Sequence, residues 1–185
     1  DAVDHVATGG QGSVFRKGDI AIKIYADPNG PMQDGLSERI RLLSRISHPY
    51  IVAPKGMVVG PRNVPLGYWM AFAQGEPLSR LFTTEYRTRS GITDAAIVQL
   101  VDRMRAAVMA AHAHGATLVD GNELNYLAWL AGPDGIEPRL IDVDAWAIGR
   151  FRAQVIMPSI RDWHATEFNA GTDWTHEVIL ICWLW

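Results

Sequence analysis

The sequence predicts an α+β fold, with strands concentrated in its first third and helices in the remainder. Residues 1–25 have the pattern of short strands, whereas the longest regular stretch, 93–114, repeats apolar residues at helical spacing. Hydrophobic residues make up 48% of the 185 positions and charged residues 20%, which is typical of a folded globular chain. This length suits one domain or two small ones that share a boundary. We place the boundary at the polar break 74–77, between a first domain of residues 1–73 and a second of residues 74–185.

The first domain is predicted to contain one helix among strands. The segment VFRKGDIAIKIY (14–25) has a two-strand pattern with a tight turn at Lys17-Gly18-Asp19, and residues 26–35 form a loop by composition. Apolar residues then recur at helical spacing at positions 36, 40, 43 and 46, and Pro49 ends that helix. Three further strands are predicted, at 51–52, 56–59 and 66–72.

The second domain is predicted to be mostly helical. A short helix is expected at 78–82, and the long helix of 93–114 follows it. Thr93 can cap the long helix, because its hydroxyl can accept a hydrogen bond from a free backbone N–H. Gly115 provides the stop signal at the other end.

A hairpin and a last helix complete the predicted second domain. The hairpin strands are expected at 125–130 and 139–144, and the helix starts at residue 173 or 174. Its final stretch, VILICWLW (178–185), is apolar all round and requires burial on every side. We therefore expect the chain to continue beyond Trp185.

Charge and cysteine content exclude several classes of protein. The net charge is −3 and the isoelectric point is near 6.1, so no basic excess indicates a nucleic-acid partner. No apolar run approaches the roughly 20 residues of a membrane span. The single cysteine, Cys182, excludes an intramolecular disulfide and favours a reducing, cytoplasmic location.

Three glycines precede a lysine that lies between apolar residues. Gly9, Gly10 and Gly12 stand between two predicted strands, and glycine lets a backbone approach a phosphate closely. An ordinary hairpin turn has the same composition. Lys23 ends the next apolar stretch, Ala21-Ile22-Lys23, where burial is costly unless an anion pairs with the ammonium. A lysine that extends to the surface is the alternative.

Glu38 is a candidate partner for that lysine. It lies on the predicted helix that follows, close to the apolar stripe, from which it could reach Lys23. The alternative is a solvated glutamate of a first helical turn, where the helix dipole favours a negative charge.

Two carboxylates and a carboxamide interrupt apolar stretches of the second domain. Asp120 and Asn125 lie on a predicted loop, at a spacing that lets both side chains face one cavity. Asp142 follows Leu140-Ile141 at a strand end, where a carboxylate packs poorly. These oxygen donors suit Mg²⁺, which keeps several waters and takes phosphates as its other ligands. Together with the glycines and Lys23, they are the parts of a phosphoryl-transfer site.

In this order the residues resemble the motifs of a eukaryotic-like, bacterial Ser/Thr protein kinase domain. GGQGSVF resembles the glycine-rich loop, AIK the strand with its lysine, and GYWMAFAQGEPLSRL the strand, hinge and following helix. VDGNELN resembles the D-x-x-x-x-N catalytic loop, LIDVD the DFG site, and TDWTHEVILICWLW the buried helix of the large lobe. The resemblance implies a protein-kinase-like two-lobe fold, with a strand-rich N-lobe at 1–73 and a helical C-lobe at 74–185 that is incomplete at its C-terminus.

The resemblance also implies roles for the matching residues. Lys23 would bind the α- and β-phosphates of ATP and pair with Glu38, and Asp120 would orient the substrate hydroxyl and accept its proton. Asn125 and Asp142 would hold Mg²⁺. A longer set would contact the nucleotide, with Met70 as gatekeeper and 71–73 as hinge: Gly9, Gly10, Gly12, Val14, Ala21, Lys23, Met70, Ala71, Phe72 and Ala73.

Four departures from the kinase pattern bear on activity. Ala7 replaces the first glycine of the loop, and Leu118-Val119 replaces the usual His-Arg before the catalytic aspartate. Asn122 stands at the position of the catalytic-loop lysine. Asp142-Val143-Asp144 replaces Asp-Phe-Gly, which makes Asp144 a rival to Asp142 as metal ligand.

These observations predict an ATP- and Mg²⁺-dependent kinase that phosphorylates Ser or Thr hydroxyls of a protein substrate. One alternative is a pseudokinase, which would bind nucleotide or act as a scaffold; the departures support it. The other is a small-molecule kinase of the aminoglycoside or choline type, which shares the spaced acid and amide but not the glycine loop. The oligomeric state stays open.

Overall fold

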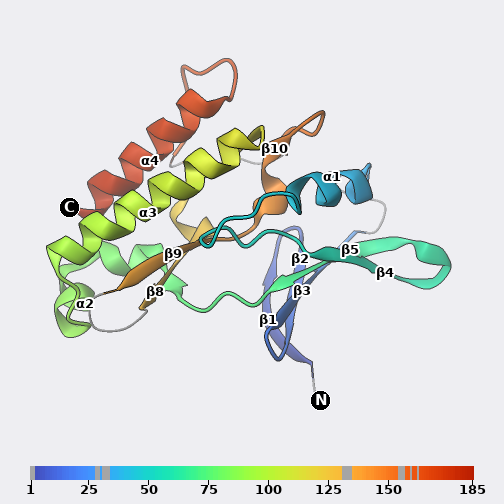
Figure 1. Cartoon of the computed structure of the whole chain (residues 1–185), viewed down its shortest axis with the longest axis horizontal. Coiled ribbons are helices and arrows are strands. Elements are labelled where there is room, and N and C mark those ends of the chain that lie inside the picture. The colour runs from blue at the N-terminus through green and yellow to red at the C-terminus, as the bar shows by residue number, and fades with distance from the viewer. Residues whose placement is uncertain are drawn as a thin grey trace.

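The chain forms a mixed α+β structure in which the sheet and the long helices occupy different halves of the molecule (Figure 1). The computed structural model describes residues 3–27, 30, 34–130, 135–153, 157–158, 160–161 and 163–185. Over these residues it has a five-stranded antiparallel sheet, two smaller sheets and four α-helices. The predicted α+β class is confirmed.

The five-stranded sheet is built from the first part of the chain. Its strands are β1 (Asp4–Gly9), β2 (Gly12–Lys17), β3 (Ile20–Tyr25), β4 (Gly56–Val59) and β5 (Pro65–Ala71), in the order β1-β2-β3-β5-β4. The predicted turn between β2 and β3 and the strands at 56–59 and 66–72 are confirmed to within one residue. The register matters for the site, because Lys23 on β3 lies opposite both Val14 on β2 and Tyr68 on β5.

Helix α1 (Leu36–Leu43) packs against this sheet. Its buried residues Leu36 and Ile40 share a core with Tyr68 and Met70. Gly35, immediately before it, has a φ of 65°, and a Cβ there would approach the ring of Phe151 to 2.7 Å. Glycine is therefore required by the backbone conformation and by the close approach of residues 150–151 to the start of α1.

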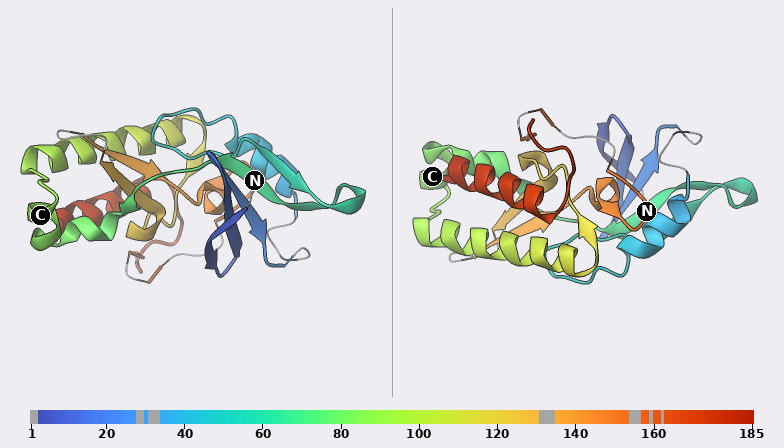
Figure 2. Two further views of the ribbon diagram at one scale, coloured as in Figure 1. Left: turned by 90° about the horizontal axis from the view of Figure 1, so that it is seen from below. Right: turned by 90° about the horizontal axis from the view of Figure 1, so that it is seen from above.

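The second half is organised around two long helices that lie side by side, α3 (Asp94–Ala113) and α4 (Ala170–Leu184) (Figures 1 and 2). The predicted cap is confirmed, because the Thr93 hydroxyl accepts a hydrogen bond from the Ala96 N–H at 3.2 Å. Helix α4 begins a few residues before the predicted start, because Asn169 and Thr172 form a capping box. The apolar face of α3 is fully buried and forms the centre of the larger core: Ile97, Leu100, Met104, Ala107, Val108 and Ala111.

Short strands form two smaller sheets in the second part of the chain. β6 (Glu76–Pro77), β8 (Tyr126–Leu130) and β9 (Ile136–Leu140) form one sheet, and β7 (Ala116–Thr117) pairs with β10 (Ala147–Ile148). The predicted hairpin is thus confirmed as β8 and β9, and most of its turn, 131–134, lies outside the described residues.

Two local predictions fail in this region. Ile51 makes only an isolated bridge to Leu140, so the predicted strand at 51–52 is wrong. Helix α2 (Thr84–Arg89) was not predicted, and it buries none of its own residues, which explains the lack of an apolar pattern.

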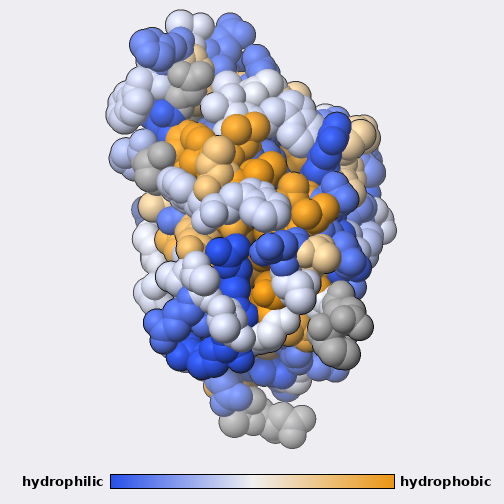
Figure 3. All heavy atoms as spheres, turned by 90° about the vertical axis from the view of Figure 1, so that its left-hand side faces the viewer, coloured by the Kyte–Doolittle hydropathy of each residue, from blue (hydrophilic) through white to orange (hydrophobic). Residues whose placement is uncertain are grey.

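Apolar side chains gather on the face at the C-terminal end of the helical half (Figure 3). In α4 and just beyond it, Val178, Trp183 and Trp185 are exposed, whereas Leu180 and Leu184 are fully buried. The apolar segment 178–185 is therefore not buried on every side in this structure. No helix among the described residues has both the length and the apolar character needed to cross a membrane.

Candidate phosphoryl-transfer site

A cleft of about 380 Å³ lies between the β1–β2 hairpin and the loops after β7 and β9. Most of the residues predicted to bind phosphate, to hold the metal or to accept the proton line this cleft, although they are far apart in the sequence. The full set is Ala7, Thr8, Gly9, Gly10, Gln11, Gly12, Val14, Lys23, Asp120, Asn125, Asp142 and Ala145. Asp120 and Asn125, which were predicted to face one cavity, both line this cleft, together with Lys23 and Asp142.

The glycines of the hairpin are of two kinds. At Gly12 a Cβ would collide with the carbonyl oxygen of Ile24, so glycine is required there by strand packing. At Gly9 and Gly10 a Cβ would meet no atom within 4 Å, and neither residue has a left-handed φ. Neither the fold nor the backbone conformation demands glycine at these two positions, and their small size leaves space in the cleft.

Lys23 is buried and paired with two carboxylates. Its Nζ lies 3.2 Å from Asp142 Oδ1 and 3.0 Å from Asp144 Oδ1, and the residue is only 4% exposed. Burial alone would lower the pKa of Lys23, but Asp144 and Asp142 together raise it above its ordinary value. Lys23 is therefore held in its charged form, as the cation of an ion pair with two carboxylates.

Asp144 is completely buried, and donors surround its carboxylate. Besides Lys23, the Tyr25 hydroxyl donates to Oδ2 at 2.7 Å and the Tyr68 hydroxyl donates to Oδ1 at 2.6 Å. Burial acts to raise the pKa of Asp144, but Lys23 and the two hydroxyls hold it below its ordinary value. Asp144 is thus an ionised group within the protein, and it does not line the cleft.

The predicted pairing of Glu38 with Lys23 is wrong. Glu38 Oε2 instead accepts a hydrogen bond from Arg150 Nε at 3.1 Å, and it forms an ion pair with the Nη2 nitrogen of the same guanidinium at 2.9 Å. The side chains of this pair are 42% and 61% exposed, so it is a surface pair. The physical reason is that Lys23 points toward residues 142–144, where two carboxylates already contact it.

Backbone strain positions Asp120. The residue before it, Val119, has a φ of 65°, which is unusual for a β-branched side chain, and Asp120 N–H donates to the Leu118 carbonyl at 2.7 Å. Asp173 at the start of α4 stabilises this turn, because its carboxylate accepts hydrogen bonds from the N–H groups of Leu118 and Val119, each at 2.8 Å. His112 on α3 contacts the same carboxylate at 2.8 Å.

The oxygens of the cleft are held by local hydrogen bonds. Asn125 Nδ2 donates to the Asp120 carbonyl at 2.8 Å, which holds the Asn125 amide beside the backbone of Asp120. Asp120 Oδ1 itself accepts the Met157 N–H at 2.9 Å. Asp142 has a φ of 53°, so a second strained residue lies in the cleft. Within the described part of the chain, no three or more His, Cys, Asp or Glu side chains cluster in a way suited to a metal.

The residues predicted to hold the adenine do not line this cleft. Ala21 and Met70 are buried in the core beneath the sheet. Ala71, Phe72 and Ala73 line a separate cavity of about 150 Å³. The structure thus brings together the phosphate-side residues, whereas the predicted hinge contacts stay a prediction.

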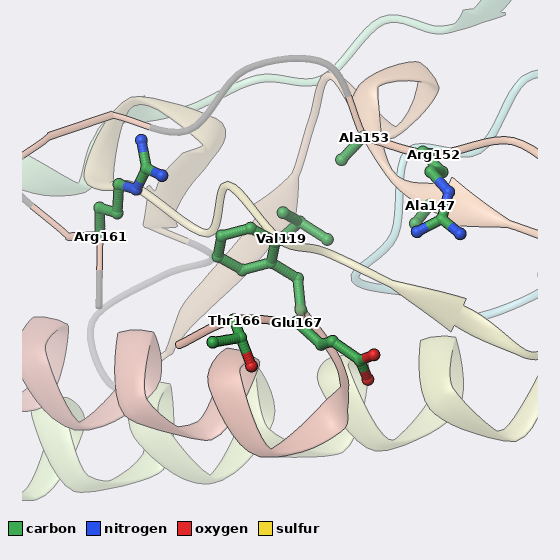
Figure 4. Close-up of a pocket in the computed structure, with 8 residues that line it drawn as sticks. Val119, Ala147, Arg152, Ala153, Arg161, Thr166 and Glu167 are labelled. Carbon is green, nitrogen blue, oxygen red and sulfur yellow. The ribbon is translucent and has the colours of Figure 1, made fainter. Parts of the chain in front are cut away.

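A larger cavity of about 580 Å³ lies beside the strained turn at Val119 (Figure 4). Val119 forms part of its wall, and Arg152, Arg161, Thr166 and Glu167 surround it from the segment between β10 and α4. Two adjacent residues of one turn therefore line different spaces: Val119 lines this cavity, and Asp120 lines the cleft with the glycines.

Sequence reasoning missed the groups that hold Lys23 and Asp120 in place. Tyr25 lies two positions after Lys23 on the same strand and therefore on the same face. Tyr68 is the cross-strand neighbour of Lys23 on β5. That periodicity was a usable signal. Asp173 carried no such signal, because it is 54 positions away from Val119 in the sequence and the two meet only through the tertiary structure. Compared with known proteins, the chain matches no family model, and no curated protein is similar enough to count as a relative.

Proposed function

We propose that this chain is an ATP- and Mg²⁺-dependent kinase, with a protein-kinase-like division into an N-lobe of residues 1–73 and a C-lobe of residues 74–185. One observation carries the proposal: Gly9, Gly10, Lys23, Asp120, Asn125 and Asp142 line the same cleft. The acceptor would be a Ser or Thr hydroxyl of a protein substrate.

The donor set fits a metal-bound triphosphate. Asn125 and Asp142 present amide and carboxylate oxygens, the hard ligands that Mg²⁺ prefers, and Lys23 offers the positive charge that phosphate oxygens need. The space at Gly9 and Gly10 would let backbone N–H groups approach phosphates, which a Cβ would hinder. When bound, ATP with Mg²⁺ supplies the phosphoryl group and neutralises its charge.

Each residue of the chain then has a defined task. Lys23, which forms an ion pair with the buried Asp144, holds the phosphates in one orientation. Asp120 orients the acceptor hydroxyl and accepts its proton, and the Met157 N–H holds the carboxylate by one oxygen. The cavity beside Val119 offers room for the acceptor chain next to Asp120.

A pseudokinase is the second candidate, and two contacts favour it. The Met157 N–H occupies one oxygen of Asp120, and Lys23 forms an ion pair with the proposed metal ligand Asp142. Both contacts would have to be exchanged before transfer. A protein that binds nucleotide and signals by conformation needs neither exchange.

A transfer assay decides between the two. The purified chain is incubated with γ-labelled ATP, Mg²⁺ and a mixture of protein acceptors, beside Asp120→Asn and the matched control Asp102→Asn at an exposed position of α3. We expect labelled protein from wild type and control, and a loss of about 10²- to 10⁴-fold in the Asp120 variant. ATP binding without transfer by wild type indicates the pseudokinase, and label on a small hydroxylated metabolite indicates a small-molecule kinase.

A further inference from the structure

The acid that positions Lys23 comes from the segment after β9 instead of from helix α1. Lys23 Nζ and Asp144 Oδ1 are 3.0 Å apart, and the side chain of Asp144 has no exposed surface. Glu38, the residue of α1 predicted for this task, is engaged at the surface with Arg150. The site therefore has an ion pair for its lysine, but a different chain segment supplies the anion.

The surroundings of Asp144 exclude a metal-binding role in this arrangement. Its Oδ1 accepts hydrogen bonds from Lys23 and Tyr68, and its Oδ2 accepts one from Tyr25. Both carboxylate oxygens of Asp144 are thus occupied by hydrogen-bond donors of the protein itself. Asp142, by contrast, is 43% exposed and lines the cleft.

The two tyrosines connect this carboxylate to β3, which carries the lysine, and to the neighbouring strand β5. Tyr25 lies on β3 with Lys23, and Tyr68 lies opposite Lys23 on β5. Tyr25 is 5% exposed and Tyr68 is fully buried, so both hydroxyls donate in a region without water competition. The position of Asp144 is therefore fixed by the same two strands whose lysine it contacts.

We infer that Asp144 is the positioning residue of Lys23, and that Tyr25 and Tyr68 orient its carboxylate, so that the lysine is held without a contact to Glu38. The importance of this arrangement for phosphoryl transfer rests on the proposed function, whereas the arrangement itself does not.

The inference can be tested on the free protein by NMR of the lysine ammonium groups. Lysine occurs only at positions 17, 23 and 55, and Lys17 and Lys55 are exposed, so the spectrum is simple. In uniformly labelled wild-type protein we expect a protected Lys23 ammonium signal with a coupling across its hydrogen bond to the carboxyl carbon of Asp144. A coupling to the Glu38 carboxyl carbon, or a Lys23 ammonium that exchanges as fast as those of Lys17 and Lys55, overturns the inference. This measurement needs no variant, so it stays decisive if substitutions at position 144 prevent folding.

Matched variants then separate positioning from general stability. Asp144→Asn should remove the protected Lys23 signal, whereas Glu38→Gln should leave it unchanged. The same signal should persist in Asp142→Asn, which retains the Asp144 contact. Loss of the signal in Glu38→Gln to the same extent as in Asp144→Asn refutes the inference.

Kinetics provide the functional arm. If the chain transfers phosphate, Asp144→Asn should lower kcat/KM for ATP without changing the Mg²⁺ concentration needed for half-maximal rate, and Asp142→Asn should raise that concentration. Glu38→Gln should keep both values within about 2-fold, as expected for a residue outside the site. If wild type neither binds nor uses ATP, the proposed function fails, but the NMR result still decides the position of Lys23.

Discussion

Glu177 provides a prediction that is independent of catalysis. This glutamate lies on α4, is 4% exposed, and accepts a hydrogen bond from the Tyr126 hydroxyl at 2.7 Å. Burial, with a contribution from the nearby negative charge of Asp173, raises its pKa from 4.5 to about 7, although the Tyr126 hydrogen bond acts in the opposite direction. Between these two pH values the folded protein keeps a proton that the unfolded chain has lost.

The sign of the effect on stability follows from proton linkage. Because the folded state binds more protons than the unfolded state, the free energy of unfolding falls as pH rises from 4.5 to about 7 and is then constant. The size of the pKa shift corresponds to a loss of about 3 kcal/mol over this window. Glu177→Gln cannot ionise, so it should become more stable relative to wild type by about 3 kcal/mol between pH 4.5 and pH 8.

Urea denaturation of both proteins at closely spaced pH values measures this difference. Other groups titrate in both proteins alike, so the difference between the two curves reports on Glu177. Tyr126→Phe is a second arm: it removes the hydrogen bond that lowers the pKa of Glu177, and the window should extend to higher pH. Parallel curves for wild type and Glu177→Gln across pH 4.5–8 would refute the assignment of a buried, protonated glutamate.

Two further pairs of substitutions test the fold and the cleft. Gly12→Ala should lower the free energy of unfolding by about 1–3 kcal/mol, because the new Cβ meets the Ile24 carbonyl. Gly10→Ala should change the free energy of unfolding by no more than about 0.5 kcal/mol, but it should weaken ATP binding. Urea denaturation measures the first quantity and calorimetric titration the second, and equal stability losses in both variants would contradict the packing argument. Met104→Ala, in the fully buried face of α3, should cost about 2–5 kcal/mol, and Met109→Ala, which is 55% exposed on the same helix, should stay within about 0.5 kcal/mol; a small cost at Met104 would show that α3 is not the centre of the core.

Much of the local structure could be predicted because it depends on short-range signals. The turn at 17–19 between two apolar runs indicates the β2–β3 hairpin, and Thr93 and Gly115 mark the ends of α3 through backbone groups that lie within one helical turn. The strand at 51–52 fails for the same reason: two apolar residues meet the composition rule, but the tertiary structure gives Ile51 only one bridging partner.

The candidate site divides in the same way. The residue types that a phosphate and a metal require were visible as interruptions of apolar stretches, and Asp120, Asn125 and Asp142 do line the cleft. Glu38 was misassigned because its spacing along the helix permits contact with Lys23 but does not fix the direction of the lysine. That direction follows from the strand register and from the positive φ of Asp142, and neither can be read from spacing.

The sequence by itself determined the α+β class, the glycine hairpin, the capped helix α3 and the chemical nature of the groups that meet in the cleft. These depend on backbone preferences and on the cost of burying charge, which act over a few residues. The tertiary structure alone decided that Asp144, separated from Lys23 by 121 positions, is its partner, and that Asp173 holds the turn before Asp120. The physical reason is that an ion pair forms where two charged groups are buried together, and only the packing of the sheet against the loops after β7 and β9 determines which groups those are.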